Sequence, residues 1–306
     1  MRPSRLVLLV PERAAEHLGA LPDSVEVVYV GRGDDLPARA LEAEFLVAGY
    51  GRGRMSEWIP RLPRLRVVQT ISAGVDWVLP LIPAGVTLCN GSGVHDTPVA
   101  EWVVAALLAL TKRFPDFRDL QREGLWKDRT VGDLEGSTVL ILGYGSIGRA
   151  VERRLEPFGV KVLRVSRTPR EGVHDLSALP DLLPQADSVV LLLPLTDQTR
   201  SLVGRDFLGQ MKPGALLVNA GRGGLVDTAA LIEALTARRI RAALDVTDPE
   251  PLPEGHPLWA LPEVLITPHV AGASPKLLER AYRLVREQIR RYLAGEPLLN
   301  VVEHGY

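Results

Sequence analysis

Short apolar runs alternate with amphipathic stretches along the first third of the chain. Five of these runs have the length and β-branched composition of buried strands, at residues 5–10, 25–30, 45–48, 67–70 and 87–89. Helical patterns such as the one at 11–18 lie between them. Because strands that alternate with helices favour parallel sheets covered by helices, we expect a small α/β domain here.

The middle of the chain repeats this alternation. Helical patterns separate most of its apolar runs, which again predicts a parallel sheet. The strand candidates number six, as a dinucleotide-binding fold requires, and they lie at residues 138–142, 160–165, 188–193, 215–219, 241–246 and 264–266.

Two longer helices are predicted beside this second series. The first begins after Asp96, with Pro98 in its first turn, and its apolar face extends to Phe114. We expect it to cross between two domains. The second helix, at 275–293, is strongly amphipathic, and the tail at 297–302 is expected to return to the first domain.

The composition limits the function. Lys and Arg number 36 and Asp and Glu 37 among 306 residues, so the net charge of −1 gives no support for nucleic-acid or anionic-membrane binding. The apolar run at 6–10 is too short for a signal-peptide core, and the run at 102–110 is too short to span a bilayer. The single cysteine, Cys89, excludes an internal disulfide, and the histidines lack metal-ligand spacing. A soluble, cytoplasmic protein without a metal is expected.

The most informative stretch is TVLILGYGSIGRAV at residues 138–151. Gly143, Gly145 and Gly148 have G-x-G-x-x-G spacing between a predicted strand and a predicted helix, the context that a dinucleotide-binding motif requires. In that motif the glycines permit a tight turn, close approach of a pyrophosphate, and close helix packing, and free N–H groups at the helix start hold the phosphates. An ordinary glycine-rich turn is the alternative. The loop residues expected to contact the cofactor are Tyr144, Gly145, Ser146 and Ile147.

The end of the next strand predicts which dinucleotide binds. An NAD site usually has Asp or Glu there, which accepts hydrogen bonds from the ribose 2′-OH. This chain has Ser166, followed by Arg167, Thr168 and Arg170. Two guanidinium groups can bind a 2′-phosphate and no carboxylate repels it, so NADP(H) is predicted as the preferred cofactor, with NAD(H) possible. The alternative is that both arginines are solvated loop charges and NAD binds.

Polar segments follow three later strands. They are NAGRGGLVD at 219–227, DVTDPEP at 245–251 and TPHVAG at 267–272. Ligands bind at the carboxyl ends of strands in open α/β sheets. Arg222, Glu250 and His269 are therefore expected to stand at three successive strand ends.

These segments resemble the D-isomer-specific 2-hydroxyacid dehydrogenase family. The family pattern is N-x-x-R-G-x-x-V-D, then D-V-x-x-x-E-P, then T-P-H, and all three occur here in order. The resemblance covers nearly the whole chain, including SAGVD at 72–76 and VAE at 99–101. It implies that Arg222 binds the substrate, that His269 is the acid/base, and that Glu250 is the carboxylate partner of His269.

The resemblance implies further contacts. Ala73 and Gly74 would offer backbone N–H groups to the substrate carboxylate, beside Arg222 and His269. Asp245 would hold the carboxamide edge of the nicotinamide. Beyond the glycine loop and the four residues Ser166, Arg167, Thr168 and Arg170, the expected cofactor-binding set is Leu193, Pro194, Thr199, Ala220, Gly221, Arg222, Asp245, Val246, His269 and Gly272.

The reduction of a 2-keto acid explains why residues of these types are needed. Reduction of a 2-keto acid needs a hydride from the nicotinamide and a proton on the carbonyl oxygen, which a histidine can supply near neutral pH. A nearby carboxylate favours the imidazolium and fixes its orientation. An arginine can bind the substrate carboxylate and polarise the carbonyl group. Each residue alone has a plain alternative as a loop or surface residue, and it is the joint constellation that predicts the site.

One loop departs from the family pattern. Thr247 and Asp248 stand where the family often has an aromatic residue and a glutamate, so the loop before Glu250 is smaller. Asp248 is the alternative partner for His269.

Other residues near the expected cleft segments are less informative. Tyr50, Arg52 and Arg54, in a glycine-rich loop, would suit an anionic or hydroxylated substrate side chain, or they are solvated. No role is derived for His95 or Trp126.

The predicted fold is α/β, with two Rossmann-like domains that contain parallel sheets. Residues 1–97 plus 284–306 would form a flavodoxin-like substrate domain, and residues 98–283 an NAD(P)-binding domain. The predicted function is NADPH-dependent reduction of a small 2-keto acid, first glyoxylate or hydroxypyruvate, to the D-2-hydroxy acid. The alternatives are an NAD-linked dehydrogenase for a bulkier acid and a non-catalytic, corepressor-like NAD(P) sensor. The helix after Asp96 suggests a homodimer.

Overall fold

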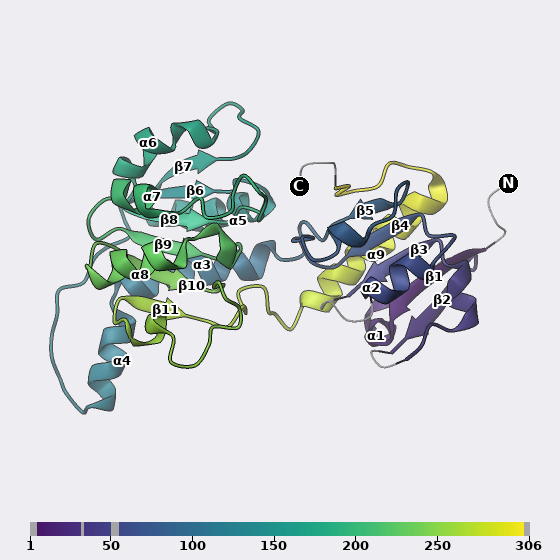
Figure 1. Ribbon diagram of the computed structural model, residues 1–306, viewed down its shortest axis with the longest axis horizontal. Coiled ribbons are helices and arrows are strands. Elements are labelled where there is room, and N and C mark those ends of the chain that lie inside the picture. The colour runs from purple at the N-terminus through teal and green to yellow at the C-terminus, as the bar shows by residue number, and fades with distance from the viewer. Residues whose placement is uncertain (1–4, 32–33, 50–54, 303–306) are drawn as a thin grey trace. The chain divides into compact units, whose positions relative to one another are not determined.

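A computed structural model describes residues 5–31, 34–49 and 55–302. The chain divides into two compact units, Met1–His95 with Ser274–Tyr306 (unit 1) and Asp96–Ala273 (unit 2) (Figure 1). The domain limits expected near residues 97 and 283 stay a prediction. Tyr50, Arg52 and Arg54 lie outside the described residues.

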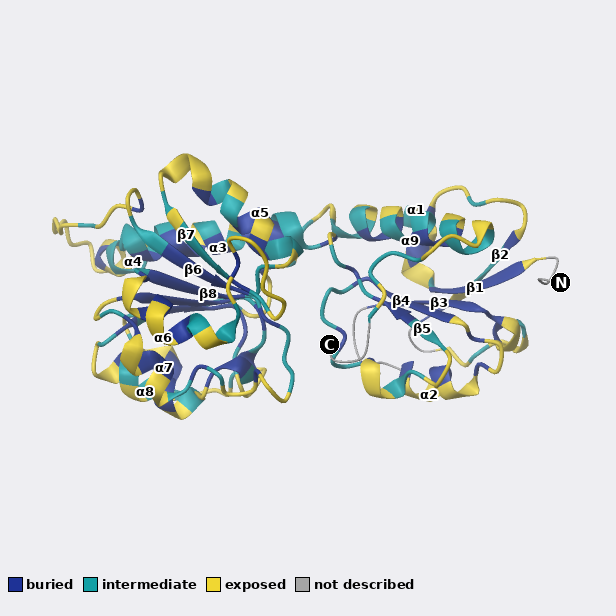
Figure 2. Ribbon diagram, turned by 90° about the horizontal axis from the view of Figure 1, so that it is seen from above, coloured by how far each residue is buried: buried dark blue, intermediate teal, exposed yellow. Residues whose placement is uncertain are grey.

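Unit 1 is built on a five-stranded parallel sheet with the order β2-β1-β3-β4-β5. Successive residues of its strands point to opposite faces of the sheet and belong to different hydrophobic cores. Leu8 belongs to the same core as Tyr282 of α9 (Leu277–Ala294), and Leu9 to the same core as Trp58 of α2 (Met55–Trp58). Figure 2 shows α9 and α2 on opposite faces of the sheet. This two-sided burial is why the strands read as continuous apolar runs. The elements are β1 (Leu6–Pro11), α1 (Ala15–Leu18), β2 (Val25–Val30), β3 (Phe45–Ala48), α2 (Met55–Trp58), β4 (Val67–Thr70), β5 (Thr87–Cys89) and α9 (Leu277–Ala294).

The C-terminal tail returns to unit 1, as the sequence predicts. Val302 N donates a hydrogen bond to Leu88 O (2.8 Å) at β5. The fully buried Gln288 of α9 donates from Nε2 to Gln69 Oε1 (2.7 Å) and to Leu299 O (2.8 Å), and its Oε1 accepts from Leu299 N (2.8 Å). Because buried amide groups are costly unless they are hydrogen-bonded, this network fixes the tail against α9 and β4.

Unit 2 contains a six-stranded parallel sheet with the order β11-β10-β9-β8-β6-β7. Leu140 belongs to the core shared with α6, α7 and α8, and Ile141 to the core shared with α3 and α5 (Figure 2). The strand order reverses between β6 and β8, and ligands bind at the carboxyl ends of strands at such a point. The elements are α3 (Asp96–Thr111), α4 (Phe114–Arg122), β6 (Thr138–Leu142), α5 (Ser146–Leu155), β7 (Lys161–Val165), α6 (Leu179–Leu182), β8 (Ser188–Leu191), α7 (Arg205–Gln210), β9 (Leu216–Asn219), α8 (Thr228–Thr236), β10 (Arg241–Leu244) and β11 (Val264–Ile266).

The two parallel sheets confirm the predicted α/β class, but the helix after Asp96 differs from the expectation. It ends at Thr111, and α4 starts separately after Arg113, whose φ of 56° is left-handed. Pro115 explains the break, since a proline lacks the N–H for a helical bond and its ring would clash with the carbonyl of Thr111. Phe114 is therefore not on the apolar face of α3 but is 60% exposed. The prediction of one helix face reaching Phe114 was wrong.

None of the described helices is both long and apolar enough to cross a membrane.

Candidate active site

The glycine loop after β6 has the geometry that its spacing predicts. Gly143 has a φ of 101°, and a Cβ there would lie 2.5 Å from the backbone of Leu192. A Cβ on Gly148 would lie 2.7 Å from Gly143 O, so only glycine permits this close packing. Gly145 faces open space, with nothing within 4 Å of an added Cβ. An open backbone beside the first turn of α5 fits a dinucleotide pyrophosphate.

Ser146 begins α5 and ties it to α3. Its Oγ donates a hydrogen bond to Asp96 Oδ2 at the start of α3. The hydroxyl is thus used inside the protein. The N–H groups of the first helical turn have no intrahelical partner and are the groups suited to hold a phosphate.

The polar residues after β7 gather beside the glycine loop. Arg170 donates from Nη2 to Tyr144 O (3.0 Å) and from Nη1 to Ser166 Oγ (3.4 Å), and Ser166 Oγ donates to Thr168 O (2.7 Å). The structure therefore brings Arg170 to the loop, and Arg167 and Thr168 are exposed beside it. These groups form a surface that fits a 2′-phosphate.

Tyr144 is supported by an ion pair that the sequence analysis missed. Its hydroxyl donates to Glu152 Oε2 on α5, and Arg164 on β7 donates from Nε to Glu152 Oε1 (2.9 Å). Burial and the hydrogen bond with Glu152 raise the pKa of Tyr144. Burial opposes charge on Glu152, but the hydrogen bonds from Arg164 and Tyr144 outweigh it and lower the pKa of Glu152. The one signal in the sequence was a charged residue, Arg164, within an apolar strand.

Arg222 follows β9 in a loop shaped by a buried asparagine. Asn219 Oδ1 accepts from Gly221 N (3.1 Å), and Asn219 Nδ2 donates to Arg222 O (3.0 Å). A Cβ on Gly223 would lie 1.9 Å from Thr247 O, so this loop packs directly against the loop after β10. Arg222 itself is half-buried at the carboxyl end of the sheet.

Asp245 builds the turn that carries His269. It is 3% exposed, and its Oδ1 accepts from Thr267 Oγ1 (2.6 Å) and Val270 N (2.8 Å), while Oδ2 accepts from Ala271 N (2.8 Å). The carbonyl of Asp245 also accepts from His269 N (2.8 Å). Both carboxylate oxygens of Asp245 thus accept hydrogen bonds from the turn. The sequence analysis did not predict this structural role of Asp245. Contact of Asp245 with a nicotinamide stays a prediction.

His269 and Glu250 form the central pair of the site. His269 Nδ1 lies 2.6 Å from Glu250 Oε1, and the two side chains are 50% and 42% exposed. This contact leaves Nε2 as the ring nitrogen available for proton exchange with a ligand. In the same loop, the backbone carbonyl of Asp248, the alternative partner, accepts a hydrogen bond from Thr228 Oγ1 (2.7 Å).

The other expected cofactor residues lie at the same carboxyl edge but differ in exposure. Thr199 is buried, and its Oγ1 donates to Pro194 O (2.7 Å) and accepts from Thr196 N (2.8 Å). Its hydroxyl therefore braces the loop after β8. Of the remaining residues, Leu193, Gly221 and Val246 are buried, and Ala220 and Gly272 are partly exposed.

Ala73 and Gly74 belong to unit 1, in the turn after β4. Ser72 Oγ donates to Gly74 O (2.9 Å), and Gly91 N donates to Ser72 O (2.7 Å). Both Ala73 and Gly74 are partly exposed. His95 Nε2 lies 3.1 Å from Ile71 O in the same unit and helps hold this segment.

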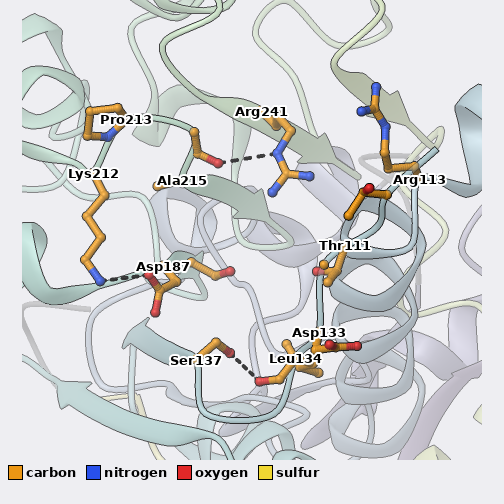
Figure 3. Close-up of a pocket in the computed structure, with 14 residues that line it drawn as sticks. Thr111, Arg113, Asp133, Leu134, Ser137, Asp187, Lys212, Pro213, Ala215 and Arg241 are labelled. Atoms are coloured by element: carbon orange, nitrogen blue, oxygen red, sulfur yellow. Dashed lines mark hydrogen bonds and ion pairs between the residues drawn. The ribbon is translucent and has the colours of Figure 1, made fainter.

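A separate pocket of about 440 Å³ lies at the opposite, amino-terminal edge of the unit 2 sheet (Figure 3). Its charges are satisfied within the protein. Lys212 Nζ pairs with Asp187 Oδ1 (2.7 Å), and Arg241 Nη1 donates to Leu110 O (2.9 Å). None of the glycine-loop or His269 residues lines it, so it is distinct from the candidate site.

Within the described ranges, no three His, Cys, Asp or Glu side chains come together as a metal-ligand group.

Comparison with known proteins gives a consistent family match. The family model for the D-isomer specific 2-hydroxyacid dehydrogenase NAD binding domain matches residues 104–271. D-3-phosphoglycerate dehydrogenase of Mycobacterium tuberculosis is 35% identical over 313 residues. That alignment covers 98% of this chain but only 59% of the relative, so the chain spans a little over half of that enzyme's length.

Two solved structures are similar over their whole length. A D-isomer specific 2-hydroxyacid dehydrogenase from Xanthobacter autotrophicus, in complex with NADPH and MES, has a TM-score of 0.86 and 33% identity, with 97% of this chain and 98% of that chain covered. An NADPH-dependent glyoxylate/hydroxypyruvate reductase from Sinorhizobium meliloti, in complex with NADP and sulfate, has a TM-score of 0.85 and 30% identity, with 98% of both chains covered.

Proposed function

This chain belongs to the D-isomer specific 2-hydroxyacid dehydrogenase family, and we propose that it reduces a small 2-keto acid to the D-2-hydroxy acid with NADPH. The observation that carries the proposal is the His269–Glu250 pair, 2.6 Å apart, at the same sheet edge as the glycine loop and Arg222. A proton donor, a carboxylate-binding cation and a dinucleotide loop are the three parts that this reaction needs.

Each residue has a defined part in the proposed reaction. Arg222 binds the substrate carboxylate and polarises the carbonyl group, and His269 delivers a proton from Nε2 to the carbonyl oxygen. Glu250 holds the ring through Nδ1 and stabilises the protonated imidazole. Asp245 keeps the His269 turn in place. The nicotinamide supplies the hydride when the cofactor is bound. In the reverse direction His269 accepts the proton.

The preference for NADPH rests on the end of β7. Ser166, Arg167, Thr168 and Arg170 offer two guanidinium groups and two hydroxyl side chains and no carboxylate. The structural relatives from X. autotrophicus and S. meliloti were solved with NADPH and NADP, which supports this preference.

Two substrate classes are favoured by specific observations. Glyoxylate and hydroxypyruvate are favoured by the overall similarity to the S. meliloti reductase, which extends over nearly all of both chains. The 35% identity to D-3-phosphoglycerate dehydrogenase favours a phosphorylated three-carbon acid as the second candidate. A substrate phosphate would need a further cation beside the site, so activity with the unphosphorylated acids separates the two.

We also propose that the protein is a homodimer. Three large apolar side chains in and after α4 are exposed, Phe114 (60%), Leu125 (40%) and Trp126 (101%). Exposed aromatic residues grouped in one segment are typical of protein interfaces. A second copy of this chain, with the same exposed segment, is the partner proposed.

The substitution His269→Gln tests the catalytic part of the proposal. Removing the acid/base should lower the rate of NADPH oxidation roughly 10²–10⁴-fold, while fluorescence titration still detects bound NADPH. If the unmodified protein binds NADPH but reduces none of the 2-keto acids, the non-catalytic sensing alternative gains instead. If His269→Gln keeps its rate, the assignment of His269 is contradicted.

A further inference from the structure

The ring of Tyr144 lies close to two guanidinium groups. Its backbone belongs to the glycine loop, and its ring lies beside the end of β7. The guanidinium carbon of Arg164 is 5.7 Å from the ring centre and that of Arg170 is 5.6 Å from it. Both distances are within the range of a cation–π interaction.

The two arginines are held in different ways. Arg164 is engaged by Glu152, to which it donates from Nε at 2.9 Å and 3.1 Å. Arg170 makes no ion pair with a carboxylate among the described residues; it donates to Tyr144 O (3.0 Å) and Ser166 Oγ (3.4 Å) and is exposed. A guanidinium has five N–H donors, so Arg170 keeps donors for a further acceptor.

The contacts form a chain from α5 to Arg170. Glu152 binds Arg164 and accepts the hydroxyl hydrogen of Tyr144, and Tyr144 then contacts Arg170 through its ring and its carbonyl oxygen. The Glu152–Arg164 pair carries no net charge. It can therefore fix the tyrosine without repelling a phosphate nearby.

We propose that Glu152 and Arg164 set the cofactor selectivity of the protein, as positioning residues that act through Tyr144 on Arg170. Arg170 binds the 2′-phosphate. The Glu152–Arg164 ion pair holds Tyr144, which contacts Arg170, in place before the cofactor binds. A group fixed in advance loses less freedom on binding, which favours NADPH over NADH. This inference rests on the proposed preference for NADPH.

The test uses variants that conserve net charge. The double variant Glu152→Gln with Arg164→Gln removes the ion pair and leaves the net charge of the protein unchanged. Long-range electrostatic attraction of the cofactor is therefore held constant. Tyr144→Leu removes the ring and hydroxyl together. The matched control is Arg205→Gln with Glu233→Gln, an exposed ion pair between α7 and α8. Dissociation constants for NADPH and NADH are measured by cofactor fluorescence, which needs no turnover.

We expect the ratio of the NADH to the NADPH dissociation constant to fall roughly threefold in the double variant and roughly fivefold in Tyr144→Leu. The control pair should leave this ratio unchanged. Circular dichroism and the melting temperature identify a variant that has not folded, and then the remaining variant decides.

Three results would overturn the inference, and they are distinguishable. If the unmodified protein binds both cofactors equally, the proposed NADPH preference fails and this inference fails with it. If the preference exists but both variants keep it, the preference stands and the role of the ion pair is refuted. If both cofactors weaken equally, the cluster supports the loop in general and does not select the phosphate.

Discussion

At the scale of single residues, the carboxylate that contacts His269 is that of Glu250. Sequence spacing favoured Glu250 but left Asp248 open, because both carboxylates lie in the same short loop. The structure puts Glu250 Oε1 2.6 Å from His269 Nδ1. Spacing could not reveal that Asp245 holds the turn of His269, since this depends on backbone N–H groups more than twenty residues away in the chain.

This pairing predicts unequal effects for two conservative substitutions. Glu250→Gln should lower kcat/KM for the keto acid roughly 10²–10⁴-fold, because a neutral amide no longer stabilises the protonated imidazole. Asp248→Asn, the matched control, should change kcat/KM less than about threefold. Steady-state rates across pH 5–9 measure both. Equal losses in the two variants would contradict the assignment.

At the scale of elements, apolar runs predicted the strands well because both faces of each sheet are covered. The runs at residues 25–30, 45–48, 67–70 and 87–89 match β2, β3, β4 and β5. The break between α3 and α4 was missed because an apolar residue, Phe114, happens to continue the helical spacing. The signal present was Pro115, which outweighs one apolar position.

The docking of the loops after β9 and β10 gives the second prediction. Gly223→Ala should lower the free energy of unfolding by about 3 kcal/mol, because the new Cβ meets a backbone carbonyl that cannot move cheaply. Gly223→Ala should also lower kcat, because the added Cβ pushes apart the two loops that carry Arg222 and Glu250.

Gly209 in α7 provides the control. A Cβ there meets nothing within 4 Å, so Gly209→Ala should be neutral or stabilise the helix by about 0.5–1 kcal/mol. Chemical denaturation measures both variants. If Gly223→Ala is as stable as the unmodified protein, the packing described for these loops is contradicted.

At the scale of the whole molecule, the residues expected to bind ligands are divided between the two units. The glycine loop, Arg222, Glu250 and His269 all belong to unit 2, and Ala73 and Gly74 belong to unit 1. Sequence patterns could predict both groups because each lies in a local motif at the end of a strand. They could not identify the Tyr144–Glu152–Arg164 cluster, which joins a loop, a helix and a strand only after folding.

The proposed dimer gives a prediction at this scale. Trp126→Ser should weaken self-association at least roughly tenfold, since exposed aromatic anchors carry much of the energy of an interface. Trp259→Ser is the control, because Trp259 is also exposed (53%) but its Nε1 donates to Pro253 O (2.9 Å) within its own unit. Sedimentation equilibrium measures the dissociation constant. A protein that is monomeric at all concentrations, or a Trp126→Ser variant that dimerises normally, would contradict the proposal.

The central claim, reduction of a small 2-keto acid with NADPH, is tested most directly by initial rates of cofactor oxidation. NADPH and NADH are compared side by side with glyoxylate, hydroxypyruvate, pyruvate and a branched 2-keto acid. We predict turnover that is highest with glyoxylate or hydroxypyruvate and a kcat/KM for NADPH roughly tenfold or more above that for NADH. Equal use of NADH would refute the phosphate site at Ser166–Arg170 and leave the chemistry of His269 intact. No turnover with any of these acids, despite tight binding of NADPH, would contradict the proposed enzyme.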